Sequence, residues 1–252
     1  MKPGQAEVDA LREDLSGVCW WCGAIADSRE HKFKASDLRR LGEKGGAKED
    51  LYWSGNGTTR GRVIQGIKRS DAVRFGKILC QQCNNSRSQP FDLAYELFSD
   101  YIATNRPALW TSRRLQLNKV FGSSWEASAA NVARYYVKSV GCLMADNGFR
   151  PPAIFGSFMN GQEALTDMSI RVIKSATLRR LDQEQIADGI DPGAGLVIGD
   201  GEAYLSRDGS AFVGYRVLLY VGYVGVEVWW EADAGPGEFF YLNRQPRIHA
   251  FP

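Results

Sequence analysis

The chain has 252 residues, with 31 lysines and arginines against 29 aspartates and glutamates, and a formal net charge of +2. Hydrophobic residues make up 44% of it, which is enough for a substantial core and excludes a disordered, collagen-like or coiled-coil chain. The longest apolar run, residues 217–230, contains Glu227 and is too short to span a membrane. The polar first residues lack the pattern of a signal peptide, so we predict a cytoplasmic protein without a membrane partner.

The first two thirds of the chain favour helices. Residues 1–17 are predicted to form a polar lead-in that is helical over residues 6–15. A short strand is predicted over 73–79. Three further helices are predicted from Pro90 to about residue 102, over 127–145 and over 175–187, because apolar side chains recur there at helical spacing. The polar stretch after Pro107 indicates a change of structural unit.

From Gly195 onward the pattern changes to strands. Short runs rich in valine, tyrosine, tryptophan and phenylalanine are separated by glycine, Asp-Gly and proline, which is typical of an antiparallel meander. Residues 213–230 are predicted to form a hairpin that turns near Gly222. The fold class is therefore predicted to be α+β, with a helical segment followed by an antiparallel β-rich C-terminal part.

Two CxxC pairs, Cys19-Trp-Trp-Cys22 and Cys80-Gln-Gln-Cys83, carry the strongest chemical signal in the sequence. Two residues between cysteines allow both sulfurs of a tight turn to reach one ion, and two such turns complete a tetrahedral thiolate site for zinc. The long excursion between the pairs must then be held at its base by the metal. A redox-active CxxC and a chance pairing remain the alternatives to structural zinc.

The residues around these cysteines resemble a known family. Glu30-His31 follows the first pair, and Asn84 comes directly after Cys83, within the segment LCQQCNNSRSQPFD. The combined pattern is similar to the HNH, or ββα-metal, nucleases, and in particular to the branch of the phage junction-resolving endonucleases, in which two zinc-binding CxxC knuckles surround the catalytic motif. The resemblance covers about residues 18–100.

The resemblance implies a role for each matching residue. His31 corresponds to the general base that takes a proton from the attacking water. Glu30 and Asn84 correspond to the ligands of a catalytic divalent ion, for which their oxygen atoms suit Mg²⁺ or Mn²⁺, although Asn85 could replace Asn84. Arg87 stands where a basic residue of the family contacts phosphate. The implied organisation is a lead-in (1–17), a zinc-stabilised HNH unit (18–105) and an α+β domain for targeting, regulation or dimerisation (106–252).

The small net charge conceals a basic block. Residues 31–90 hold 13 lysines and arginines but only 5 aspartates and glutamates. Charge alone is also typical of a solvated surface. Together with the resemblance to the HNH nucleases, it favours a polyanionic partner. We expect the following side chains to contact nucleic acid: Lys32, Lys34, Arg60, Arg62, Lys68, Arg69 and Arg87.

The sequence and the resemblance together predict a metal-dependent endonuclease that hydrolyses DNA with little sequence specificity, in phage biology, restriction or antiphage defence. No segment is typical of a base-reading recognition helix. Two alternatives remain open: a non-catalytic zinc module that binds nucleic acid, and an HNH nuclease that cleaves RNA. An activating or targeting protein partner and a homodimer are compatible with either.

Overall fold

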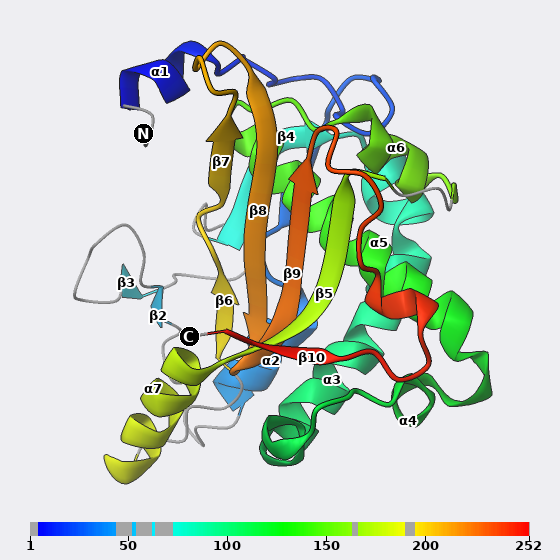
Figure 1. Ribbon diagram of the computed structural model, residues 1–252, viewed down its shortest axis with the longest axis vertical. Helices are drawn as coiled ribbons and strands as arrows, with labels where there is room; N and C mark the ends of the chain where they lie inside the picture. The colour runs from blue at the N-terminus through cyan, green and yellow to red at the C-terminus, as the bar shows by residue number, and fades with distance from the viewer. Residues whose placement is uncertain are drawn as a thin grey trace.

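The structure is a computed structural model of the chain and describes residues 5–43, 52–53, 62–63, 73–162, 166–189 and 195–251. It combines helices with antiparallel sheets, which confirms the predicted α+β class. The largest sheet stands in front in Figure 1, with the two long helices α3 (Gln89–Thr111) and α5 (Trp125–Asp146) behind it. No helix among the described residues is long and apolar enough to cross a lipid bilayer.

A two-stranded antiparallel sheet, called the hairpin below although a long segment joins its strands, lies beside the first cysteine pair. It consists of β1 (Ser28–His31) and β4 (Arg74–Leu79), and His31 faces Arg74 across the ladder. The strand predicted over 73–79 is thus confirmed. Among the residues described between the two strands, the structure has the short elements α2 (Ala35–Glu43), β2 (Tyr52–Trp53) and β3 (Arg62–Val63).

The first helix, α1 (Gln5–Ala10), is shorter than the prediction over residues 6–15. The chain leaves the helix because the N–H of Glu13 donates a hydrogen bond of 2.8 Å to the carbonyl oxygen of Gly148, far along the sequence. A tertiary contact therefore replaces the local helical bond.

Helix α3 follows the hairpin through a π-helical turn, η2 (Gln82–Arg87). Its predicted apolar stripe is buried, and Pro90 occupies its first turn. Helix α3 continues through Pro107 to Thr111, so the change of structural unit predicted at Pro107 and the polar stretch after it does not coincide with the end of a helix at Pro107. Proline removes one helical hydrogen bond, but Leu109 is buried in the core and stabilises the last turn.

Helix α5 confirms the helix predicted over 127–145 and packs against α3. Two short helices flank it, α4 (Leu117–Phe121) and α6 (Ala153–Met159). The helix predicted over 175–187 is also confirmed as α7 (Ala176–Ala187), and its first residue is capped by the Ser175 hydroxyl, which accepts a hydrogen bond from the N–H of Leu178.

The C-terminal part contains a six-stranded sheet in the order β10-β5-β9-β8-β6, with β7 also paired to β8. Its strands are β5 (Met168–Ser175), β6 (Leu196–Ile198), β7 (Glu202–Leu205), β8 (Phe212–Val221), β9 (Val224–Glu231) and β10 (Ile248–Phe251). The hairpin predicted near Gly222 is confirmed as β8 and β9, and Gly222 has the positive φ of 63° that the tight turn requires. The sheet departs from the predicted antiparallel meander at one edge, where β10 pairs with β5 in parallel.

A single large hydrophobic cluster joins the hairpin, the long helices and the sheet. It runs from Leu15 to Ile248 and includes Cys19 and Cys83. The predicted boundary between residues 105 and 106 falls inside α3. Groups on the hairpin are therefore in reach of side chains from α5, far along the chain.

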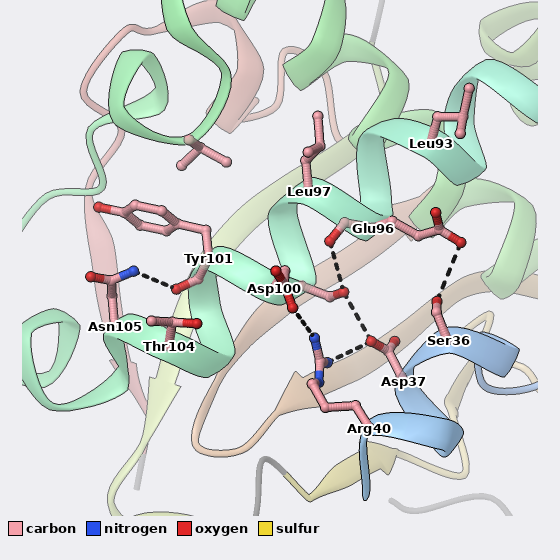
Figure 2. Close-up of a pocket in the computed structure, with 12 residues that line it drawn as sticks. Ser36, Asp37, Arg40, Leu93, Glu96, Leu97, Asp100, Tyr101, Thr104 and Asn105 are labelled. Carbon is pink, nitrogen blue, oxygen red and sulfur yellow. Dashed lines mark hydrogen bonds and ion pairs between the residues drawn. The ribbon is translucent and has the colours of Figure 1, made fainter. Parts of the chain in front are cut away.

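Helix α2 is fixed to α3 by a buried carboxylate (Figure 2). Asp37 is 1% exposed and accepts hydrogen bonds from the hydroxyls of Tyr95 (2.8 Å) and Ser99 (2.9 Å) and from the guanidinium of Arg40. Burial raises the pKa of Asp37, while these partners oppose the rise. The network lies beside a cavity of about 670 Å³ and anchors the chain directly after β1.

Candidate metal centre and adjoining cavity

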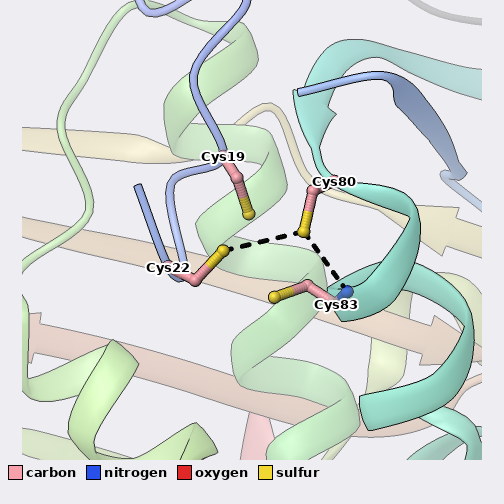
Figure 3. A group of neighbouring side chains, drawn as sticks. All are labelled: Cys19, Cys22, Cys80 and Cys83. Carbon is pink, nitrogen blue, oxygen red and sulfur yellow. Dashed lines mark hydrogen bonds between the residues drawn. The ribbon is translucent and has the colours of Figure 1, made fainter. Parts of the chain in front are cut away.

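Four cysteines from the two CxxC pairs meet at one point (Figure 3). The sulfur atoms of Cys19, Cys22, Cys80 and Cys83 all lie within 4.8 Å of one another. Four convergent sulfurs are the donor set of tetrahedral metal sites, so this cluster could hold a metal ion such as zinc.

Local backbone bonds shape both cysteine turns. In the first, the N–H of Cys19 donates to the carbonyl oxygen of Ala24 (2.7 Å), and Gly23 supplies a positive φ of 77°. In the second, the N–H of Cys83 points to the sulfur of Cys80 at 3.4 Å, and the N–H of Asn84 donates to the carbonyl oxygen of Cys80. Each turn thus aims its two sulfurs to one side.

Helix α5 supports the first turn from behind. The indole N–H of Trp20 lies 3.4 Å from the sulfur of Cys142, a core cysteine outside the cluster. A side chain at Gly141 would collide with the Trp20 ring, because a Cβ atom there would lie 2.5 Å from it. The absence of a side chain at this position lets the cysteine turn and the helix approach closely.

Arg87 belongs to the cysteine cluster in this structure. Its guanidinium donates to the sulfur of Cys83 (3.4 Å) and to the side-chain oxygen of Asn160, and it stacks 4.3 Å from the ring centre of Trp21. These three contacts place the Arg87 guanidinium beside the cysteine cluster, where its positive charge would offset that of thiolates, and its predicted contact with phosphate stays a prediction.

A cavity of about 560 Å³ opens at the hairpin, next to the cysteine cluster. The three predicted catalytic residues Glu30, His31 and Asn84 all line it, although 53 positions separate Asn84 from His31 in the chain. The other lining residues are Asp27, Ser28, Arg29, Lys34, Ala35, Arg74, Lys77, Asn85 and Asp92.

Asn84 presents an unused acceptor. It is 8% exposed, and its amide nitrogen donates to the hydroxyl of Ser28 at 2.8 Å. Its side-chain oxygen is buried and has no hydrogen-bond partner. An unpaired buried acceptor costs about 1–3 kcal/mol, so this oxygen favours a ligand at Asn84 rather than at the exposed Asn85.

Glu30 is buried beside a lysine that the sequence analysis did not single out. The ammonium of Lys138 in α5 is fully buried and lies 3.3 Å from the Glu30 carboxylate and 3.1 Å from that of Asp92. Burial raises the pKa of Glu30, and Lys138 opposes the rise. For Lys138, burial acts to lower the pKa, but the two carboxylates raise it overall.

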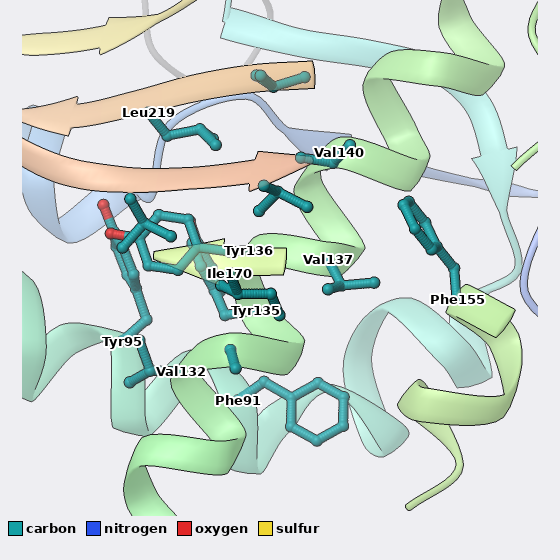
Figure 4. Close-up of a cluster of buried hydrophobic side chains, with 14 of the residues drawn as sticks. Phe91, Tyr95, Val132, Tyr135, Tyr136, Val137, Val140, Phe155, Ile170 and Leu219 are labelled. Atoms are coloured by element: carbon teal, nitrogen blue, oxygen red, sulfur yellow. The ribbon is translucent and has the colours of Figure 1, made fainter. Parts of the chain in front are cut away.

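Lys138 also contacts the hydroxyl of Ser88, at 3.2 Å, and an aromatic ring of its own helix. Its ammonium lies 5.6 Å from the ring centre of Tyr135, which belongs to the cluster drawn in Figure 4. A lysine flanked by Tyr135, Tyr136 and Val137 on a core helix was the available signal in the sequence. Its partner Asp92 lies in the first turn of α3 and also binds Lys34 at 3.1 Å.

His31 contacts the guanidinium of Arg74 from the facing strand. The Nε and Nη2 atoms of Arg74 lie 3.2 Å and 3.1 Å from Nε2 of His31. Burial, followed by the nearby charges of Arg74, Lys34 and Lys138, lowers the pKa of His31 to about 4. The imidazole is therefore neutral at pH 7.

The predicted nucleic-acid contacts are only partly visible. Lys34 lines the cavity, and Lys32 lies 3.9 Å from the carboxylate of Asp146. Arg60, Lys68 and Arg69 lie outside the described residues, as does the side chain of Arg62.

Comparisons with known proteins add no family to this geometry: no family model, no curated protein and no solved structure matches the chain.

Proposed function

We propose that this protein is a metal-dependent endonuclease of the HNH type that hydrolyses DNA phosphodiester bonds with little sequence specificity of its own. The observation that carries the proposal is the meeting of Glu30, His31 and Asn84 in one cavity, on a hairpin next to four convergent cysteines. Acid, imidazole and amide oxygen supply the metal ligands and the base that phosphodiester hydrolysis needs.

Two kinds of metal fit the residues. The four cysteines suit structural zinc. The Glu30 carboxylate and the unpartnered oxygen of Asn84 would hold Mg²⁺ or Mn²⁺, since both ions prefer oxygen ligands. A carboxylate has lone pairs for more than one partner, so Glu30 can keep Lys138 as well. The bound ion would stabilise the negative charge of the phosphate and of the leaving oxygen.

The reaction then requires one proton acceptor. A ring nitrogen of neutral His31 takes a proton from water, and the water oxygen forms a bond to phosphorus. The bond between phosphorus and the 3′ oxygen breaks, and the 3′ oxygen keeps the electron pair and is protonated by solvent. The products are a 5′-phosphate and a 3′-hydroxyl. Lys34, Lys77 and Arg29 line the same cavity and favour an anionic backbone.

One observation favours the alternative of a non-catalytic zinc module that binds nucleic acid. Glu30 already has a cationic partner in Lys138, at 3.3 Å. A structural ion pair of this kind would hold α5 against the hairpin without any reaction, and the basic cavity would still bind phosphate.

Cleavage of supercoiled plasmid by the full chain tests the proposal. We expect nicking with Mg²⁺ or Mn²⁺, none with EDTA, and a loss of at least about 100-fold in His31→Ala, as is usual for a lost general base. His249→Ala is the matched control, because His249 pairs with Glu238 outside the cavity, and it should retain activity. Labelled RNA is assayed in parallel to test the RNA alternative. Binding of both nucleic acids without cleavage of either would support the zinc module.

A single site of this kind cuts one strand per event. Simultaneous double-strand breaks would therefore indicate a homodimer, and activity only in the presence of cell extract would indicate an activating partner. Both are proposals about the same cavity. A role in phage biology or antiphage defence fits such an enzyme and rests on the same resemblance.

A further inference from the structure

The contact between Arg74 and His31 fixes where the imidazole carries its proton. A guanidinium has only donors, and two of its nitrogens lie 3.2 Å and 3.1 Å from Nε2 of His31. Nε2 must therefore accept with its lone pair, and the neutral ring carries its proton on Nδ1. In this arrangement neither ring nitrogen is free to take a proton from water.

We infer that Arg74 blocks His31 in the free protein and that a phosphate group of the substrate draws Arg74 away, so that substrate binding itself releases the base. This inference rests on the proposed function and deepens it. Arg74 is a positioning residue for His31 and, once moved, a contact for the phosphate.

The two strands of the hairpin hold the pair in place. His31 and Arg74 face each other across the β1–β4 ladder, so their side chains leave the sheet at neighbouring points. Arg74 has no ion pair with a carboxylate among the residues that the structure describes. This contrasts with Lys34, which binds Asp92 at 3.1 Å. The main side-chain partner of Arg74 is thus the neutral ring of His31, which is a weaker acceptor than an anion.

A phosphate oxygen is the stronger competitor. The phosphate oxygen carries a negative charge whereas the imidazole nitrogen is neutral, and guanidinium–phosphate hydrogen bonds are often bidentate. The cavity also contains Lys77, which is exposed, and Lys34, and these charges raise the local concentration of anions. Arg74 is only half-buried, so a short movement of its side chain suffices.

The arrangement makes the base dependent on the ligand. Without a phosphate group in the cavity, His31 is occupied as an acceptor. With one, Nε2 becomes free at the same moment that the phosphorus atom is near. The ligand class is an anionic phosphate ester, and the same chemistry applies to DNA and to RNA.

Imidazole ¹⁵N spectra of the full chain test this directly. The protein has only two histidines, and a His249→Gln background leaves the signals of His31 alone. We expect the free protein to show mainly the Nδ1–H form, with Nε2 as acceptor. Inorganic phosphate, added at pH 7 to the zinc-loaded protein without Mg²⁺ or Mn²⁺, should shift the Nε2 signal, whereas sodium chloride at the same ionic strength should not.

Variants of Arg74 and of a neighbour make the test specific. Arg74→Ala should move most of the His31 population to the Nε2–H form and abolish the response to phosphate. Arg74→Lys still donates to Nε2 and should restore the Nδ1–H form, with a response to phosphate reduced several-fold. This variant keeps the test decisive if Arg74→Ala folds poorly. Lys77→Ala changes an exposed cation of the same cavity and should keep the wild-type tautomer.

Two results would overturn the inference: a free wild-type protein in the Nε2–H form, or phosphate and chloride acting alike. Neither readout depends on cleavage. Activity with an unresponsive His31 would refute the inference and leave the proposed nuclease standing. A responsive His31 without activity on DNA or RNA would keep Arg74 as a phosphate contact and refute the nuclease.

Discussion

The cysteine cluster and the Glu30 cavity lie side by side on one hairpin, yet they are built on opposite principles. The cluster brings four donors of the same kind within 4.8 Å, and Arg87 contacts only one of them, at Cys83. In the cavity, Glu30, Asp92 and His31 each contact a cation of the protein itself. The cluster thus gathers donors that could share one metal ion, whereas the acidic groups of the cavity already contact cations of the protein.

This difference explains why the two sites support different conclusions. Burial raises the pKa of Cys19 and Cys83, and a metal ion binds cysteine as the thiolate, so metal binding to this cluster would release protons and strengthen as the pH rises. In the cavity, Glu30 and Asp92 already contact Lys138, so a divalent ion at Glu30 would share that carboxylate with the lysine.

Removing one cysteine should have the largest effect. Cys80→Ser takes away a metal ligand, and because metal binding contributes directly to folding, we expect loss of bound zinc and unfolding of the hairpin region. Zinc content by elemental analysis and the melting temperature measure the two effects. Cys142→Ser is the matched control, since Cys142 is buried but outside the cluster. Equal zinc content in both variants would contradict the assignment.

Removing the lysine should break the balance of the cavity. Lys138→Met leaves Glu30 and Asp92 without their shared partner, and losing one side of a buried ion pair costs about 3–5 kcal/mol in the free energy of unfolding. Urea denaturation at pH 7 measures this. Lys77→Met, an exposed lysine of the same cavity, should change stability by less than about 0.5 kcal/mol.

A second variant separates charge from packing. Adding Glu30→Gln to Lys138→Met should recover part of the lost stability, because it removes one unpaired charge. A double variant that is no more stable than Lys138→Met would show that packing, rather than charge balance, holds α5 on the hairpin.

The smallest effect concerns acid. The pKa of His31 is lowered to about 4 in the folded protein, so between pH 6.5 and pH 4 the unfolded chain binds a proton that the folded chain does not. The contribution of His31 to the free energy of unfolding is therefore constant above pH 6.5, and it lowers this free energy progressively as the pH falls from 6.5 to 4. Because the ring is half-exposed, we expect only about 1 kcal/mol.

The measurement compares the loss of unfolding free energy between pH 7 and pH 4 in three proteins. His31→Gln should lose less than the wild type, while His249→Gln should behave like the wild type. Burial also raises the pKa of Glu30 and of Asp37, and both groups are present in all three proteins, so the comparison isolates the contribution of His31. An unchanged loss in His31→Gln would refute the effect.

Much of the architecture could be predicted because its causes are local. The helical spacing of apolar residues identified α3, α5 and α7, and glycine at the turn identified the β8–β9 hairpin. The strand β5 was missed, although its alternating burial is that of a sheet strand. The parallel pairing of β5 with β10 was also not predicted, because the residue pattern within one strand does not indicate which strand it pairs with.

What the sequence alone determined is therefore the inventory: two cysteine pairs, a neighbouring acid and histidine, an asparagine after the last cysteine, and amphipathic helices, all set by spacing along the chain. Only the tertiary structure decided how these groups are paired. Lys138 reaches Glu30 because α5 packs against the β1–β4 strand pair in one core, and Arg74 reaches His31 because the two strands that carry them are paired, although 43 positions separate the two residues. Both contacts depend on distance in space, which periodicity and spacing do not encode.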